Sequence, residues 1–67
     1  MSTDQLVHAL KRVLKNRQIP YAELARRIGM SEASVKRLFS QRTFTLARLE
    51  AILGAIEIDF FELARLA

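Results

Sequence analysis

Residues 21–40 read YAELARRIGMSEASVKRLFS, and this stretch decides the fold. Apolar residues recur at helical spacing on both sides of Gly29: Leu24, Ala25 and Ile28 before it, and Val35, Leu38 and Phe39 after it. Glycine takes the left-handed conformation that ends a helix at little steric cost, and Ser31 is a good N-cap for the next helix. Because only Met30 separates them, the sequence predicts two helices that cross at a tight turn.

Ahead of this stretch, the sequence predicts one helix from about Thr3 to Asn16. Ser2 and Gln5 have the spacing of a capping box, in which each side chain satisfies a backbone N–H of the other residue. Apolar side chains then recur at helical spacing: Leu6, Leu10, Val13 and Leu14. Pro20 stops this pattern and restarts the chain, because proline lacks a backbone N–H and fits best in the first turn of a helix.

Behind the stretch, two short helices are predicted. Thr45 can cap a helix whose inward side chains are expected to be Leu46, Leu49, Ile52, Leu53 and Ile56. Gly54 lies inside this helix and should cost about 1 kcal/mol relative to alanine, so either another helix packs closely there or the helix is weak. Asp59 and Glu62 have the spacing of a second capping box. We therefore expect an all-helical chain of five helices that forms one domain over residues 1–67.

Charge is distributed unevenly along the chain. Residues 1–42 hold nine Lys/Arg against three acids, a net charge of +6, whereas residues 43–67 hold two against four, a net charge of −2. This asymmetry favours a face that meets a polyanion, although a solvated basic surface would have the same composition. The chain has no cysteine, which fits a reducing compartment, and no apolar run of membrane-spanning length. We expect a cytoplasmic protein with no membrane contact.

Residue types that carry catalysis are scarce in this sequence. The chain has a single histidine, His8, no cysteine and no glycine-rich loop, so it offers no catalytic triad, metal cluster or phosphate cradle. We expect His8 to be a partly exposed residue of the first helix rather than a ligand or a base. A domain this small also leaves little room for an effector pocket. We predict no enzyme activity, no metal, no cofactor and no small-molecule effector.

The pattern LAxxxGxSxxxVxxL over residues 24–38 resembles the helix-turn-helix of the Cro/repressor-like (XRE-type) family of bacterial and phage regulators. The resemblance covers nearly the whole chain, since that family also has one helix before the motif and two after it. It implies a five-helix lambda-repressor-like fold and a regulator of the repressor type that binds double-stranded DNA sequence-specifically, with the helix after Ser31 in the major groove. The alternative is another small helical bundle, which leaves the polar, partly basic outer face of residues 32–40 unexplained.

Carried over by position, the resemblance places Glu32, Ala33 and Arg37 at base edges. Arg37 can donate two hydrogen bonds to guanine. Glu32 could accept one from cytosine or only favour the start of its helix through the dipole, and Ala33 could touch a thymine methyl or be small because the groove is close. The residues expected at the DNA backbone are Tyr21, Ser34, Lys36, Ser40, Gln41, Arg42 and Thr43. Further charge could come from Arg17, Arg26 and Arg27, the last two of which could equally lie on an outer face without contacts.

Two positions depart from the family pattern. A glycine is frequent in that family where this chain has Gln41 and again where it has Glu57, so we expect both loops to differ in shape. The first loop bears on the backbone contacts, and the second bears on the placement of the last helix.

The last helix suggests how two copies could pair. Phe60 and Phe61 are adjacent and cannot both face the same core, so one of them is expected at the surface. Because family members commonly pair through this region, the resemblance implies a homodimer joined through Phe60, Phe61 and Leu66. Such a dimer would bind an inverted repeat with its two reading helices about 34 Å apart. The alternatives are a monomer with one exposed phenylalanine, a protein-interaction module, or an antitoxin component on the same scaffold.

Overall fold

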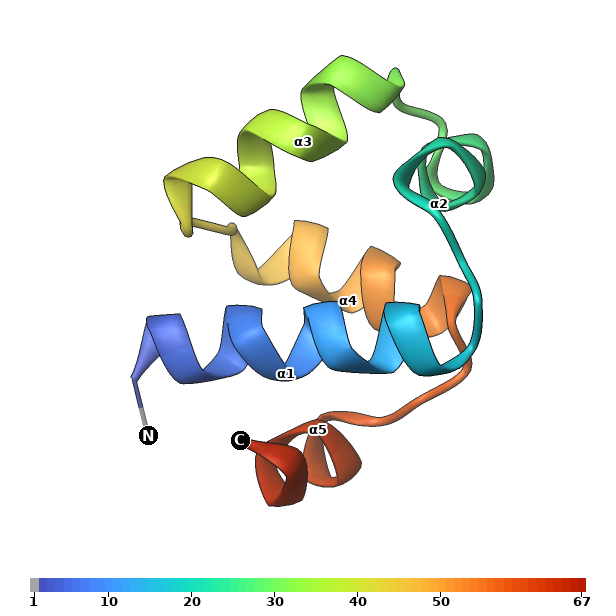
Figure 1. Cartoon of the computed structure of the whole chain (residues 1–67). Coiled ribbons are helices and arrows are strands. Elements are labelled where there is room, and N and C mark those ends of the chain that lie inside the picture. Colours follow the sequence, from blue (N-terminus) through green and yellow to red (C-terminus); the bar gives the residue numbers. More distant parts are fainter. Residues whose placement is uncertain (1) are drawn as a thin grey trace.

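The computed structural model describes residues 2–67 and consists of five helices (Figure 1). They are α1 (Thr3–Asn16), α2 (Tyr21–Ile28), α3 (Glu32–Gln41), α4 (Leu46–Ala55) and α5 (Phe60–Leu66). The described residues contain no strand. The predicted all-helical fold is therefore confirmed, with its helix-turn-helix formed by α2 and α3.

Side-chain caps begin four of the five helices described. In α1 both halves of the capping box between Ser2 and Gln5 form. The caps of α3 and α4 are single hydrogen bonds, to Ser31 and Thr45. In α5 the Asp59 carboxylate accepts a hydrogen bond from the Glu62 N–H at 2.7 Å, but no return bond from the Glu62 side chain forms within residues 2–67. The second predicted capping box is thus only half formed.

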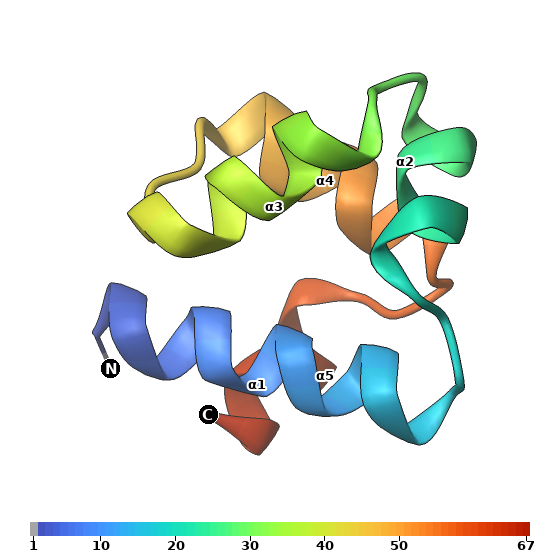
Figure 2. The same ribbon diagram turned by 45° about the horizontal axis from the view of Figure 1, so that its top comes forward.

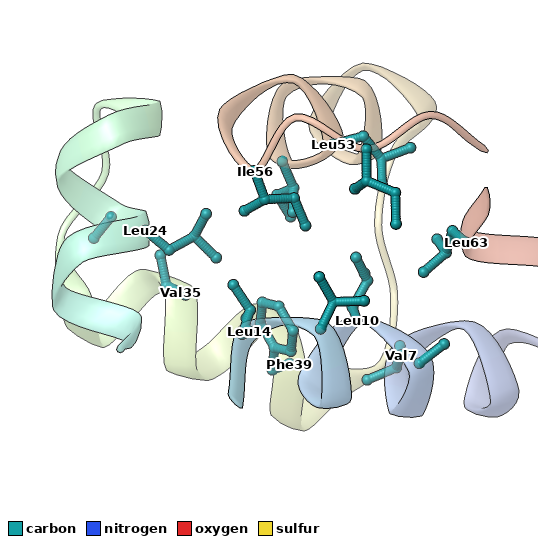
Figure 3. Packing of buried hydrophobic residues seen from close by; sticks show 14 residues of the cluster. Val7, Leu10, Leu14, Leu24, Val35, Phe39, Leu53, Ile56 and Leu63 are labelled. Atoms are coloured by element: carbon teal, nitrogen blue, oxygen red, sulfur yellow. The ribbon is translucent and has the colours of Figure 1, made fainter. Parts of the chain in front are cut away.

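Side chains from all five helices converge on one core (Figure 3). Its buried members are Val7, Ala9, Leu10, Val13, Leu14, Leu24, Ala25, Val35, Phe39, Ile52, Leu53, Ile56, Ile58 and Leu63. Phe39 of α3 is central, because its ring lies 4.9 Å from that of Tyr21 and 5.5 Å from that of Phe44, measured between ring centroids. This aromatic group ties α3 to the start of α2 and to the loop before α4. The margin of the core holds half-buried side chains, including Leu6, Ile28, Leu38 and Leu49.

The prediction that Leu46 points inward is wrong. Its side chain is 85% exposed. Leu46 is the first residue of α4 and lies at the edge of the stripe that faces the core, where helical periodicity alone does not decide burial. It lines an open surface groove of about 470 Å³ together with Leu53 and Phe60.

Gly54 does not mark a close helix–helix contact. A Cβ placed on Gly54 would meet nothing within 4 Å, and its φ is not in the left-handed region. The first of the two alternatives offered by the sequence, close packing, is therefore wrong.

We predict that Gly54→Ala raises the free energy of unfolding by about 0.5–1 kcal/mol, because alanine loses less backbone entropy than glycine in a helix. Urea unfolding monitored by circular dichroism measures this change. Gly29→Ala is the matched control and should destabilise the protein, since Gly29 has a φ of 72°. A destabilised Gly54→Ala variant would show that this position needs glycine.

The loops where the chain lacks the family's glycines both contain a residue with left-handed backbone. Glu57 has a φ of 57°, and after α3 the left-handed residue is Arg42, also at 57°, while Gln41 is the last residue of the helix. Non-glycine residues pay about 1–2 kcal/mol for this conformation. The turn after α3 is therefore centred one residue later than the position where the family has glycine.

Candidate nucleic-acid interface

The turn between α2 and α3 sets the geometry of the motif. Gly29 adopts the left-handed conformation, and its N–H and that of Met30 both donate to the carbonyl of Ala25. This arrangement closes α2 abruptly and lets the chain reverse direction within a few residues. In Figure 1, α2 is seen nearly along its axis while α3 runs across the view, so the two helices cross steeply.

One side of α3 is anchored in the core and the other is free. Val35 and Phe39 are buried, and Leu38 is half-buried. On the opposite side, the helical period brings together five exposed residues: Glu32, Ala33, Lys36, Arg37 and Ser40. In Figure 1, α3 lies at the upper edge of the molecule, and in Figure 2 it runs across the front of the view, so this face is not covered by another helix.

The three predicted base-contact residues differ in whether they form ion pairs within the protein. Arg37 is exposed and takes part in none of the ion pairs found among residues 2–67. Glu32 forms an ion pair with Lys36 one turn later, with its Oε2 3.3 Å from Nζ. Ala33 is exposed beside them. Arg37 is therefore the side chain on this face best placed to donate hydrogen bonds to a ligand.

Ser34, a predicted backbone contact, is half-buried, and its Oγ accepts a hydrogen bond from Ser31 Oγ at 2.9 Å. Its hydroxyl is thus already engaged at the start of α3. By contrast, Ser40 is exposed near the end of the helix.

The ends of the motif hold the other predicted backbone contacts. Tyr21 is the first residue of α2, and its burial raises the pKa of its hydroxyl, which therefore stays protonated and can donate. Gln41, Arg42 and Thr43 are exposed where α3 ends. The Arg42 guanidinium forms an ion pair with Asp4 at the start of α1, with Nη1 3.4 Å from Oδ2.

The arginines of α2 and of the preceding turn have structural partners. Arg27 donates to the carbonyl of Ala55 at 3.1 Å, and Arg17 donates to that of Ile56, so both satisfy carbonyls at the end of α4. Arg27 and Ala55 are 28 positions apart in the sequence, and Arg17 and Ile56 are 39 positions apart. No local sequence pattern predicted either bond. The helix dipole also favours the positive charges of Arg17 and Arg27 at the C-terminus of α4.

Arg26 belongs to a local cluster on α2. It and Arg27 both donate to the Glu23 carboxylate, and these hydrogen bonds lower the pKa of Glu23 to about 2. Because the pKa is depressed, this interaction is intact above the ordinary range of a glutamate and is lost only as the pH falls towards 2. Arg26 is thus exposed and paired within its own helix.

The three residues predicted to join two copies do not share one side of α5. Phe61 is 79% exposed, which confirms that one phenylalanine lies at the surface, and Phe60 is itself 43% exposed. Phe60 lies in the groove beside α4, whereas Leu66 lines a different hollow, beside Val7 and His8 of α1. The exposed apolar surface of α5 is therefore continuous with α4 through Phe60, and Leu66 stands apart from it.

Comparison with known protein families matches residues 9–66 to the Cro/C1-type HTH DNA-binding domain. The matched region includes α2, α3 and every position predicted to face DNA. Comparisons with curated proteins and with solved structures give no match. Among residues 2–67, no helix combines the length and apolar character needed to cross a bilayer. The helix-turn-helix geometry and this match lead to the same conclusion: the chain belongs to the Cro/C1-type HTH DNA-binding domain family.

Proposed function

We propose that this chain is a cytoplasmic transcription regulator of the repressor type, acting as one domain over residues 1–67. In this proposal α3 enters the major groove of double-stranded DNA and reads its sequence. The observation that carries it is the outer face of α3, which is exposed, mostly polar and includes Arg37, an arginine without an ion-pair partner among the described residues. A solvated helix face does not require such an arginine, whereas an arginine that donates to guanine is the commonest specific contact of a base-reading helix.

The proposed contacts divide into two groups. Arg37 donates to guanine, with Glu32 and Ala33 beside it at base edges. The DNA backbone is contacted by residues at the rim of this face: Tyr21, Ser34, Lys36, Ser40, Gln41, Arg42 and Thr43. Three members of this group already have partners: Ser34 bonds to Ser31, Lys36 pairs with Glu32, and Arg42 pairs with Asp4.

The size of the domain supports the proposal of a homodimer on an inverted repeat. Its longest Cα dimension is 28 Å, shorter than the roughly 34 Å between half-sites one helical turn apart. One copy therefore reaches one half-site, and two are needed for an operator of ordinary affinity. The proposed pairing surface on α5 is formed by the exposed Phe60 and Phe61, whereas Leu66, also predicted to take part, lines a different hollow.

We predict that Phe61→Ser converts the dimer to a monomer, because it replaces the most exposed phenylalanine of the predicted interface with a polar side chain. Sedimentation equilibrium measures the mass, which should fall from two copies to one while the circular dichroism spectrum stays unchanged. Leu46→Ser is the matched control, since it alters an equally exposed apolar residue at the start of α4. Dissociation by the control alone would move the interface from α5 to α4.

The proposed function is tested by selecting bound duplexes from a random DNA pool and measuring the affinity for the winner across a salt series. Enrichment of an inverted repeat together with a steep salt dependence is expected. If no sequence is enriched and binding is weak, the scaffold serves a protein partner instead. The exposed side chains of Leu46, Phe60 and Phe61 favour that second function, which includes an antitoxin role.

A further inference from the structure

An ion pair joins the start of α1 to the end of α3. In both Figures 1 and 2 the first turn of α1 lies next to the last turn of α3. Asp4 Oδ2 is 3.4 Å from Arg42 Nη1, and both side chains are more than half exposed. Because water reaches both side chains, neither charge needs the other as a partner to be stable. The pair involves Arg42, one of the residues predicted to contact the DNA backbone.

Both partners are attached to well-defined backbone. Arg42 has left-handed backbone and caps α3 with an N–H that donates to the carbonyl of Leu38 at 3.1 Å. Asp4 lies in the first turn of α1, whose start is held by the capping box of Ser2 and Gln5. The aspartate and the arginine therefore stay near each other even when their exposed side chains exchange rotamers.

The side chain of Asp4 is negatively charged, whereas the charged side chains around it are basic. The hollow that contains the pair, about 350 Å³ in volume, is also lined by His8, Lys11 and Arg12. Among the side chains that line it, Asp4 is the only acidic one. Its carboxylate offsets the positive potential at the place where Arg42 would meet a DNA phosphate.

A phosphate bound by Arg42 would lie close to the Asp4 carboxylate. A guanidinium has five N–H donors, and this one directs a single nitrogen at Asp4, so other donors remain open to a phosphate oxygen. Two anions held by the same guanidinium repel each other, and this repulsion is stronger at a partly desolvated interface than in bulk water.

We propose that Asp4 lowers the affinity of this domain for DNA by occupying Arg42 and by repelling the phosphate that Arg42 would bind. The inference rests on the proposed function, in which Arg42 contacts the DNA backbone. Asp4 thus sets the strength of sequence-independent binding without touching a base. Weaker sequence-independent binding helps a domain to dissociate from non-specific DNA and reach its operator.

The test compares Asp4→Asn with wild type for binding to a random-sequence DNA duplex by fluorescence anisotropy. We expect Asp4→Asn to bind about threefold to tenfold more tightly at low ionic strength, and the gain to shrink as salt is added. Glu50→Gln is the matched control, because it makes the same change in net charge on α4 beside the Phe60 groove. Its gain should be clearly smaller. Circular dichroism and thermal unfolding check that both variants are folded.

A double-mutant cycle with Arg42→Ala identifies the partner. The gain from Asp4→Asn should fall substantially in the Arg42→Ala background, because the competed group is gone. Three outcomes would each overturn the inference about Asp4 while leaving the proposed function intact. They are equal gains from Asp4→Asn and Glu50→Gln, weaker binding by Asp4→Asn, and an undiminished gain in the Arg42→Ala background. If wild type binds neither this duplex nor a selected one, the proposed function fails and the inference falls with it.

Discussion

Arg37→Ala is expected to weaken binding to the selected operator by about 1–3 kcal/mol and to relax base preference at one position of each half-site. The physical reason is that Arg37 lies exposed on the outer face of α3 and has no ion pair to hold it there among residues 2–67. Losing its two hydrogen bonds to guanine removes discrimination as well as affinity. Selection from a random pool, repeated with the variant, measures both quantities.

Two further variants separate base reading from charge. Arg37→Lys keeps the positive charge but loses the planar fork of donors, so it should resemble the alanine variant in base preference. Lys36→Ala, on the same face, should weaken binding to all sequences alike and reduce the salt slope by about one unit. If Arg37→Ala produces only this uniform weakening, Arg37 contacts phosphate and another residue reads the base.

Phe39→Ala is expected to unfold the domain at 25 °C, because removing a buried phenylalanine costs about 3–5 kcal/mol. A small domain of this kind has a stability of the same order, at roughly 0.05–0.15 kcal/mol per residue. Phe39 is only 1% exposed, and its ring packs against Tyr21 and Phe44. Its loss would therefore release α3 from α2 and from the loop that follows. Circular dichroism and urea titration measure the effect.

The matched control is Phe61→Ala, which makes the same chemical change at a side chain that is 79% exposed. At protein concentrations where the chain is monomeric, its free energy of unfolding should lie within about 0.5 kcal/mol of wild type. Phe39→Leu, which keeps most of the apolar volume, should fall between the two. A folded Phe39→Ala variant of wild-type stability would contradict the burial of this ring.

Most of the helix boundaries could be predicted because their causes are local. The Ser31 cap reaches Ser34, and the Thr45 cap reaches Arg48, over three residues in each case. Gly29 closes α2 through bonds to Ala25. Such interactions depend on residue type and spacing, which the sequence states directly. The helix-turn-helix and its exposed outer face follow from the same short-range rules.

Interactions between distant residues were not predictable in this way. Leu46 matches the apolar period of α4, yet it is exposed at the first position of that helix. Arg17 and Arg27 bond to carbonyls at the end of α4, contacts that the local sequence did not indicate. Each outcome depends on which surfaces meet in three dimensions, and periodicity carries no information about that.

The candidate DNA interface combines both kinds of information. The sequence alone determined that α3 presents Arg37 opposite its buried side, because a period of 3.6 residues separates the faces of any helix. Only the tertiary structure decided that Asp4 lies at the end of α3 and that Phe60 and Leu66 occupy separate hollows. The reason is physical: local hydrogen bonds and helical period are set along the chain, whereas the neighbours of an exposed side chain are set by how the helices pack.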